Sequence, residues 1–296
     1  MNVYVWPIVV GSLAGIITRL FMLKGDYRQY PTYLHGKIIH IALGVIAAGL
    51  GSIIVPALLL EEYTAITFLT IAASQFRDVR NMERNTLTGL DDYELVKRGN
   101  TYIEGIAIAF EGRNYLVILT SLLVTSVHVF SNIWFALGTV VLCIIGCRKL
   151  MSGSTLEDIV DIEYLEPRFD GAGLYVDNIY IMNIGLPARQ QEVLRYGMGF
   201  ILKPKNFNAR ITIANLGQRQ AILHDTAVAL GVYRDSGTPA LVPLAKRDLD
   251  DGRVAVFILP QEKDINKAIK VIGNVPTLEN AIRLPSKIDI NKKGIL

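Results

Sequence analysis

The residues best placed for chemistry in this chain are two carboxylates and an arginine that come just before a long apolar segment. Glu104, Glu111 and Arg113 precede a run of mostly apolar residues from 116 to 147. Ionised side chains are expensive near hydrocarbon, and they usually find a partner, a water-filled path or the membrane interface. We therefore interpret this region as an acidic face that binds a partner or lines a pathway, with Arg113 as its counter-ion.

The spacing of the two carboxylates supports this interpretation. Glu104 and Glu111 are seven residues apart and so share one face of a helix. Small residues between them would let another helix approach closely. The predicted partner or pathway face consists of Glu104, Gly105, Ala109, Glu111, Gly112 and Arg113. The alternative is an ordinary helix start, because Thr101 and Glu104 have the spacing of a capping box and the other charges would then be solvated at the interface.

Two further sets of residues suit a membrane protein. Gly11 and Gly15 form a GxxxG pattern, which predicts helix packing inside a bundle, with formation of a homo-oligomer as the alternative. Arg19 lies one turn from the end of the first apolar segment and is expected to snorkel toward lipid phosphates. The candidate lipid head-group site consists of Arg19, Arg28, His35 and Lys37.

Metal, cofactor and catalytic motifs are not found. His40, His128, Cys143 and Cys147 match no standard zinc spacing, so we expect no metal there. The acidic segment 248–252 lacks the glutamate that ends a calcium loop, and it is predicted to be a solvated turn. The chain contains no phosphate-binding loop, nucleophile elbow or zinc-protease motif. The sequence therefore predicts no cofactor and leaves any catalytic residue unknown.

The composition is that of a membrane protein. Apolar residues make up 51% of the 296 residues, and the mean hydropathy is +0.35. Before Arg148 there are ten basic and ten acidic residues, and from Arg148 onward there are twenty and seventeen. This small excess does not indicate a partner made of nucleic acid. The two cysteines lie in an apolar segment, which suits a reducing compartment.

Five apolar segments are candidate membrane spans, and together they form a predicted α-helical bundle over residues 1–150. The third would cover only about 21 Å at 1.5 Å per residue, so it is either a tilted span or a re-entrant segment. The last two are separated by a turn at Ser131 and Asn132, and the helix of the fourth is expected to begin between Tyr102 and Tyr115. The predicted spans are 4–23, 38–60, 63–76, 102–131 and 133–147.

Basic residues occur in alternate loops between these segments, as the positive-inside rule expects. The loop before residue 38, the loop after residue 76 and the segment after residue 147 all contain Lys or Arg, whereas the other two loops contain none. This pattern places the N-terminus outside and the C-terminal half in the cytoplasm.

Residues 151–287 are predicted to form a cytoplasmic α+β domain, followed by a loose tail at 288–296. Acidic residues after Ser154 and Thr155 indicate the start of a helix. His224 and Asp225 are neighbours on a predicted helix and so should not form a dyad. The predicted strands are 175–184, 199–202, 209–214 and 254–259, and the predicted helices are 218–230, 262–272 and 277–283.

The hexapeptide at positions 102–107 reads YIEGIA, and with the stretches 174–185 and 229–235 it resembles the YIEGIA family. This family comprises multi-pass membrane proteins of endospore-forming Firmicutes without an assigned reaction. The resemblance implies a protein of the cell membrane, or of a forespore membrane, that is made during sporulation. It also implies a small cognate partner, the capping complex subunit for YIEGIA.

Three functions are consistent with these observations. The first is an integral membrane component of a sporulation-associated complex, whose cytoplasmic domain docks a partner protein. The second is a small transporter or channel with an acidic cytoplasmic vestibule. The third is a membrane-bound enzyme of unknown substrate, for which the sequence offers no polar constellation.

Overall fold

The computed structural model divides the chain into two compact units. The helical unit comprises Met1–Asn85 and Ile106–Ser152, and the α+β unit comprises Thr86–Gly105 and Gly153–Leu296. The segment 86–105, which the sequence analysis placed with the membrane spans, therefore belongs to the α+β unit. The structure describes residues 2–26, 34–150, 154–233, 241–278 and 280–282.

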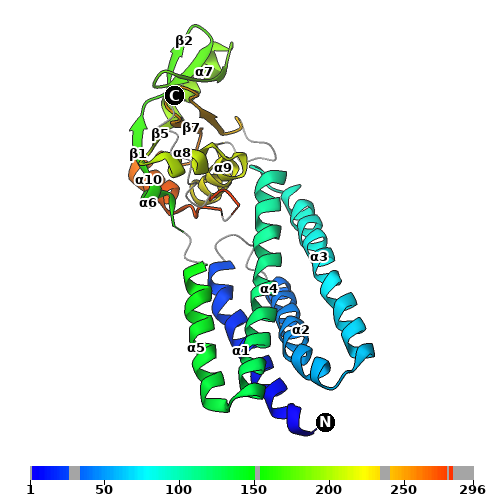
Figure 1. Cartoon of the computed structure of the whole chain (residues 1–296). Helices are drawn as coiled ribbons and strands as arrows, with labels where there is room; N and C mark the ends of the chain where they lie inside the picture. The colour runs from blue at the N-terminus through cyan, green and yellow to red at the C-terminus, as the bar shows by residue number, and fades with distance from the viewer. Residues whose placement is uncertain (1, 27–33, 151–153, 234–240, 279, 283–296) are drawn as a thin grey trace. The chain divides into compact units, whose positions relative to one another are not determined.

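Five long helices run alternately up and down in the first half of the chain (Figure 1). The predicted turn at Ser131 and Asn132 is confirmed. The Oδ1 atom of Asn132 accepts hydrogen bonds from the backbone N–H groups of Trp134 and Phe135 at 3.0 and 3.1 Å. Asn132 thereby caps the start of the fifth helix. The helices are α1 (Asn2–Asp26), α2 (Leu34–Leu59), α3 (Tyr63–Asp91), α4 (Asn100–Phe130) and α5 (Ile133–Leu150).

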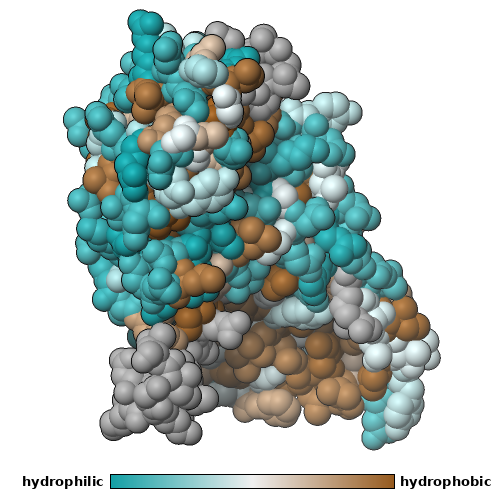
Figure 2. Space-filling model, turned by 90° about the horizontal axis from the view of Figure 1, so that it is seen from above, coloured by the Kyte–Doolittle hydropathy of each residue, from teal (hydrophilic) through white to brown (hydrophobic). Residues whose placement is uncertain are grey.

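Within the described residues, four helices are long and apolar enough to cross a membrane: Val3–Leu23, Gly36–Leu59, Asn100–Phe130 and Ile133–Leu150. Helix α3 is not among them, because the apolar segment 63–76 continues without a break into a charged second half that ends at Asp91. Figure 2 shows the hydrophobic residues gathered in one region of the visible surface, with hydrophilic residues over most of the rest.

Helix α4 begins at Asn100, two residues before the predicted range. Thr101 is therefore already inside the helix, and the predicted capping box with Glu104 is wrong. The carboxylate of Asp91 instead accepts hydrogen bonds from the N–H groups of Arg98 and Gly99, at 2.6 and 3.0 Å. These two hydrogen bonds fix the loop between α3 and α4 just before α4 begins.

Glycines bring α1 and α2 close to α4. A Cβ atom on Gly11 would collide with the Thr125 side chain, and one on Gly15 would collide with Ser121. A Cβ atom on Gly51 of α2 would collide with the backbone carbonyl of Ile118. The GxxxG pair of α1 thus lies against α4 within the same chain, which is the packing expected of small residues between membrane helices.

The α+β unit contains two antiparallel sheets. The four-stranded sheet has the order β1-β5-β7-β6, and the three-stranded sheet has the order β2-β3-β4. The strands are β1 (Val160–Leu165), β2 (Arg168–Asp170), β3 (Gly173–Val176), β4 (Ile179–Asn183), β5 (Met198–Pro204), β6 (Leu244–Arg247) and β7 (Val254–Ile258). The helices are α6 (Leu156–Ile159), α7 (Pro187–Tyr196), α8 (Phe207–Ala214), α9 (Leu216–Leu230) and α10 (Ile265–Asn274).

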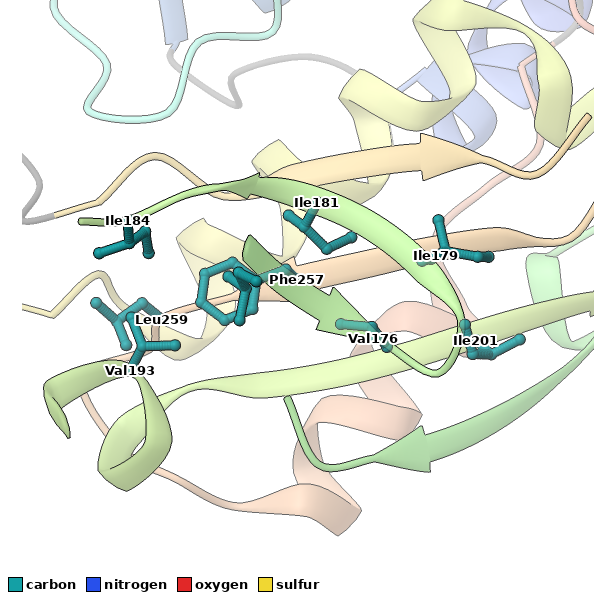
Figure 3. Packing of buried hydrophobic residues seen from close by; sticks show 10 residues of the cluster. Val176, Ile179, Ile181, Ile184, Val193, Ile201, Phe257 and Leu259 are labelled. Carbon is teal, nitrogen blue, oxygen red and sulfur yellow. The ribbon is translucent and has the colours of Figure 1, made fainter. Parts of the chain in front are cut away.

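One apolar core joins the two sheets and α7 (Figure 3). Ile179 and Ile181 of β4 are buried while Tyr180 between them is exposed, as the alternation of a strand requires. Phe257 of β7 and Val193 of α7 are buried in the same cluster. The small sheet thus turns one face to the core and leaves the other at the surface.

The predicted α+β class is confirmed for this half of the chain, with two local corrections. The single strand predicted at 175–184 is a hairpin of β3 and β4, because residues 177–178 form a turn between them. Residues 209–214 were predicted to be a strand, but they belong to α8. The side chain of Asn206 accepts a hydrogen bond from the N–H group of Ala209 at 2.8 Å and so caps this helix. Helix α9 ends as predicted at Gly231, whose φ of 69° suits glycine. The predicted tail at 288–296 and most of the predicted helix 277–283 lie outside the described residues.

The close approach of α2 and α4 leads to a prediction. Gly51→Ala places a methyl group against the Ile118 carbonyl, so the helices must move apart, and overpacking of this kind costs about 1–3 kcal/mol. Gly49→Ala, on the same helix, meets nothing within 4 Å and is the matched control. Thermal unfolding in detergent should show a lower Tm for Gly51→Ala only. Equal Tm values for the two variants would contradict the packing described here.

Candidate functional site

A buried cluster of charged and polar side chains lies inside the helical unit. Arg19 of α1 is only 1% exposed, and His40 of α2 and Glu83 of α3 are also buried. The Nη2 atom of Arg19 lies 3.3 Å from Nδ1 of His40, and Nε lies 3.5 Å from the His40 carbonyl oxygen. The Nε2 atom of His40 lies 3.9 Å from Oε1 of Glu83. We call these three residues the Arg19–His40–Glu83 cluster.

Helix α4 also contributes to the cluster, through the side chain of Phe110. The guanidinium carbon of Arg19 lies 5.3 Å from the centre of the Phe110 ring, within cation–π range. The rings of His40 and Phe110 are 4.5 Å apart. Gly44 of α2 leaves room for the aliphatic part of Arg19, because a Cβ atom there would lie 2.5 Å from Cγ of the arginine. Helices α1, α2, α3 and α4 therefore each contribute one side chain to the surroundings of the buried guanidinium, α3 through the contact of Glu83 with His40.

The geometry determines where the proton of a neutral His40 lies. A guanidinium only donates hydrogen bonds, so Nδ1 of His40 must accept from Arg19. The proton of the neutral imidazole is then on Nε2, which faces the Glu83 carboxylate. An imidazole between an arginine and a carboxylate can hold a proton on the side of the carboxylate, although Nε2 and Oε1 are 3.9 Å apart and so are not hydrogen-bonded.

The position of Arg19 differs from the sequence expectation. We expected its guanidinium to snorkel to lipid phosphates, but it is buried against His40 and Phe110 because partners on α2 and α4 lie within reach. Of the other predicted head-group residues, Arg28 and the side chain of His35 lie outside the described residues, and Lys37 is half-buried.

The predicted face from Glu104 to Arg113 is divided between the two units. Glu104 and Gly105 belong to the α+β unit, where a Cβ atom on Gly105 would lie 2.7 Å from the Asn280 side chain. Ala109, Glu111, Gly112 and Arg113 belong to the helical unit. There the Glu111 carboxylate lies 3.5 Å from the Arg80 guanidinium and accepts a hydrogen bond from the Tyr115 hydroxyl at 3.2 Å. Ala109 and Arg113 are buried, and Gly112 is exposed.

The first residues of the hexapeptide are held by α9 of the α+β unit. Tyr102 is buried, and its ring meets that of His224 edge-on with the centres 6.5 Å apart. Nδ1 of His224 lies 2.7 Å from the carbonyl oxygen of Val96, to which it donates a hydrogen bond. Gly217 of α9 allows the backbone of Thr101 to come close. This role of His224 could not be predicted, because nothing in the sequence links it to residues more than 100 positions earlier.

The described histidines and cysteines of the helical unit form no metal-binding group. Among the described residues no three His, Cys, Asp or Glu side chains are grouped so that they could hold a metal ion. His40 belongs to the Arg19–His40–Glu83 cluster, and Cys143 and Cys147 are free thiols on α5.

Comparison with known proteins identifies the family. The model of the family described as YIEGIA protein matches residues 7–288. The chain belongs to the YIEGIA family. It is also 68% identical over 296 residues to the uncharacterized protein YphB of Bacillus subtilis (strain 168), with the whole of both chains covered. No solved structure matches this chain.

All residues of the YIEGIA hexapeptide except Glu104 are buried. Tyr102 and Ile103 are buried within the α+β unit, and Ile106 and Ala107 are buried within the helical unit. Beside Tyr102, burial raises the pKa of Asp225 from 3.8 to about 7, although the nearby charge of Arg98 acts in the opposite direction.

This raised pKa predicts how stability depends on pH. Folding binds a proton at Asp225 between pH 4 and 7, so its contribution to stability is greatest at low pH and is lost as the pH rises toward 7. Asp225→Asn cannot ionise. We expect the variant to have a Tm several degrees above wild type at pH 8, with the difference vanishing near pH 4.

The control for this prediction is Asp161→Asn, a change at an exposed aspartate on β1. Its Tm difference from wild type should be small and should not depend on pH. A Tm difference for Asp225→Asn that is the same at pH 8 and pH 4 would rule out an ionisation penalty at this site.

Proposed function

We propose that this protein is an integral membrane component of a sporulation-associated complex, and that its α+β unit docks a partner protein. The observation that carries this proposal is a group of two tyrosines and an arginine on the outer face of the three-stranded sheet, in which Tyr180 and Arg168 are exposed and Tyr175 is half-buried. We call Arg168, Tyr175 and Tyr180 the Tyr–Arg patch.

The Tyr–Arg patch has the features of a protein-binding surface. Tyr180 is 47% exposed, although it lies on a strand whose neighbouring side chains form the core. Its ring meets that of Tyr175 edge-on with the centres 5.6 Å apart, because the two residues are paired across β3 and β4. The guanidinium carbon of Arg168 lies 5.2 Å from the centre of the Tyr175 ring. Tyrosine and arginine are the residues most enriched where binding energy is concentrated.

The strands also hold the patch in a fixed geometry. Arg168 is opposite Tyr175 in the β2–β3 pair, and its Nε atom donates a hydrogen bond to the Asp177 carbonyl at 3.0 Å. Because these side chains are ordered before binding, a partner would lose little conformational entropy on their account. We propose that the occupant is the small cognate subunit implied by the family, the capping complex subunit for YIEGIA.

The proposed membrane arrangement has five crossings, with the N-terminus outside and the α+β unit in the cytoplasm. Aromatic side chains that are strongly exposed stand at the starts of α1, α3 and α5, which lie at the same end of the helical unit (Figure 1): Trp6, Tyr63 and Trp134. Tryptophan and tyrosine favour the membrane–water interface. Phe68 and Ile71 of α3 are also exposed, as lipid-facing residues would be. These features support α3 as a fifth crossing, in agreement with the basic residues in alternate loops.

The docking proposal is tested by producing the full-length protein together with the small subunit and purifying the complex in detergent. We expect the subunit to co-purify with wild type. Tyr180→Ala should reduce the amount retained by about tenfold or more, because a residue at the centre of an interface contributes on the order of 2 kcal/mol.

The matched control is Arg189→Ala, which removes an exposed arginine of α7 that pairs with Glu192 in the same unit. This variant should retain the subunit at the wild-type level. The proposal fails if Tyr180→Ala and Arg168→Ala both retain the subunit as wild type does, or if wild type retains none.

A further inference from the structure

Three polar side chains follow one face of α4 through the helical unit. Asn114, Ser121 and His128 are each seven residues apart, which is about 10.5 Å along a helix, so they lie on one stripe. The stripe runs within the apolar segment that could cross a membrane. We call these three residues the α4 polar seam.

Each residue of the seam has a buried polar atom that lacks a hydrogen-bond partner among the described residues. These atoms are Nδ2 and Oδ1 of Asn114, Oγ of Ser121 and Nδ1 of His128. Asn114 and Ser121 are 0% exposed. A buried polar group without a partner costs about 1–3 kcal/mol, and in native proteins such groups are usually bonded to protein or ordered water.

Two neighbouring hydroxyl groups, in contrast, are bonded within their own helices. The hydroxyl groups of Thr18 and Ser126 donate to carbonyl oxygens one turn earlier in their own helices, at 2.9 and 2.6 Å. Ser121 makes no such bond to its own helix. The three residues of the seam cannot bond to one another either, because their spacing is several times the length of a hydrogen bond.

The residues opposite part of the seam have no side chain that could hydrogen-bond to it. Ser121 lies against Gly15 of α1, and Thr125 lies against Gly11. Thr125 donates a long hydrogen bond of 3.4 Å to the Pro7 carbonyl, which adds another polar contact to this boundary. At its other end the seam comes within one turn of Phe110, the wall of the Arg19–His40–Glu83 cluster.

We infer that the α4 polar seam binds water molecules, which hydrogen-bond to Asn114, Ser121 and His128 and form a path for proton exchange between the His128 end of α4 and the Arg19–His40–Glu83 cluster. Water supplies both donors and acceptors, which the amide and the imidazole require. The charged and titratable groups at the inner end of this path are Arg19, His40 and Glu83, from α1, α2 and α3. This inference does not depend on the docking role.

The inference is tested by the access of water to single cysteines in the full-length protein. Cys143→Ala and Cys147→Ala first remove the native thiols, and Asn114→Cys, Ser121→Cys and His128→Cys are then made one at a time. The protein in liposomes is exposed to Ag⁺, which reacts with thiols that water reaches. The remaining thiols are counted after denaturation by the gel shift that a maleimide polymer produces.

The matched controls are Leu119→Cys and Leu123→Cys, because these residues of α4 point out of the helical unit. We expect Ag⁺ to react at least tenfold faster at the three seam positions than at the two controls. Rates at positions 114, 121 and 128 equal to the control rates would overturn the inference. If Asn114→Cys does not fold, Ser121→Cys decides the question, because it exchanges one atom for a larger one of similar chemistry.

Discussion

The helical unit is organised around the burial of one positive charge. A guanidinium taken out of water is costly unless partners surround it. Arg19 contacts His40 of α2 and the face of Phe110 of α4, and His40 in turn faces Glu83 of α3. Gly44 gives the arginine the space it needs. Because each helix contributes to the same contact, a shift of any one of them would leave a charged group without its partner.

Within the α+β unit, α9 packs against the segment that joins α3 to α4. His224 of α9 donates a hydrogen bond to the Val96 carbonyl, and the Asp91 carboxylate accepts one from the N–H group of Arg98 in the same loop. The buried ring of Tyr102 packs against His224. Small residues allow this close contact, because side chains on Gly99 or Gly217 would meet Gln220 or the Thr101 backbone.

Features set by local sequence could be predicted, whereas contacts between distant segments could not. The turn at Asn132, the end of α9 at Gly231 and the mixed α+β class follow from capping residues and apolar periodicity. The strand predicted at 209–214 was wrong, because alternating apolar residues resemble a strand and the cap from Asn206 was overlooked. The cluster around Arg19 unites residues 19, 40, 83 and 110, and no local pattern connects them. For the same reason the sequence placed the residues from Glu104 to Arg113 on one partner or pathway face, whereas the structure divides them between two units.

The most direct test of this account is a double-mutant cycle on the buried charges. Arg19→Met and Glu83→Met keep the volume of each side chain and remove its charge, and the free energy of unfolding is measured for both single variants and the double variant in detergent. The account predicts that each single change costs about 3–5 kcal/mol, since it leaves a buried charge uncompensated, and that the double variant loses clearly less than the sum. Costs that add within about 0.5 kcal/mol would show that Arg19 and Glu83 act independently, and would contradict a helical unit built around their shared burial.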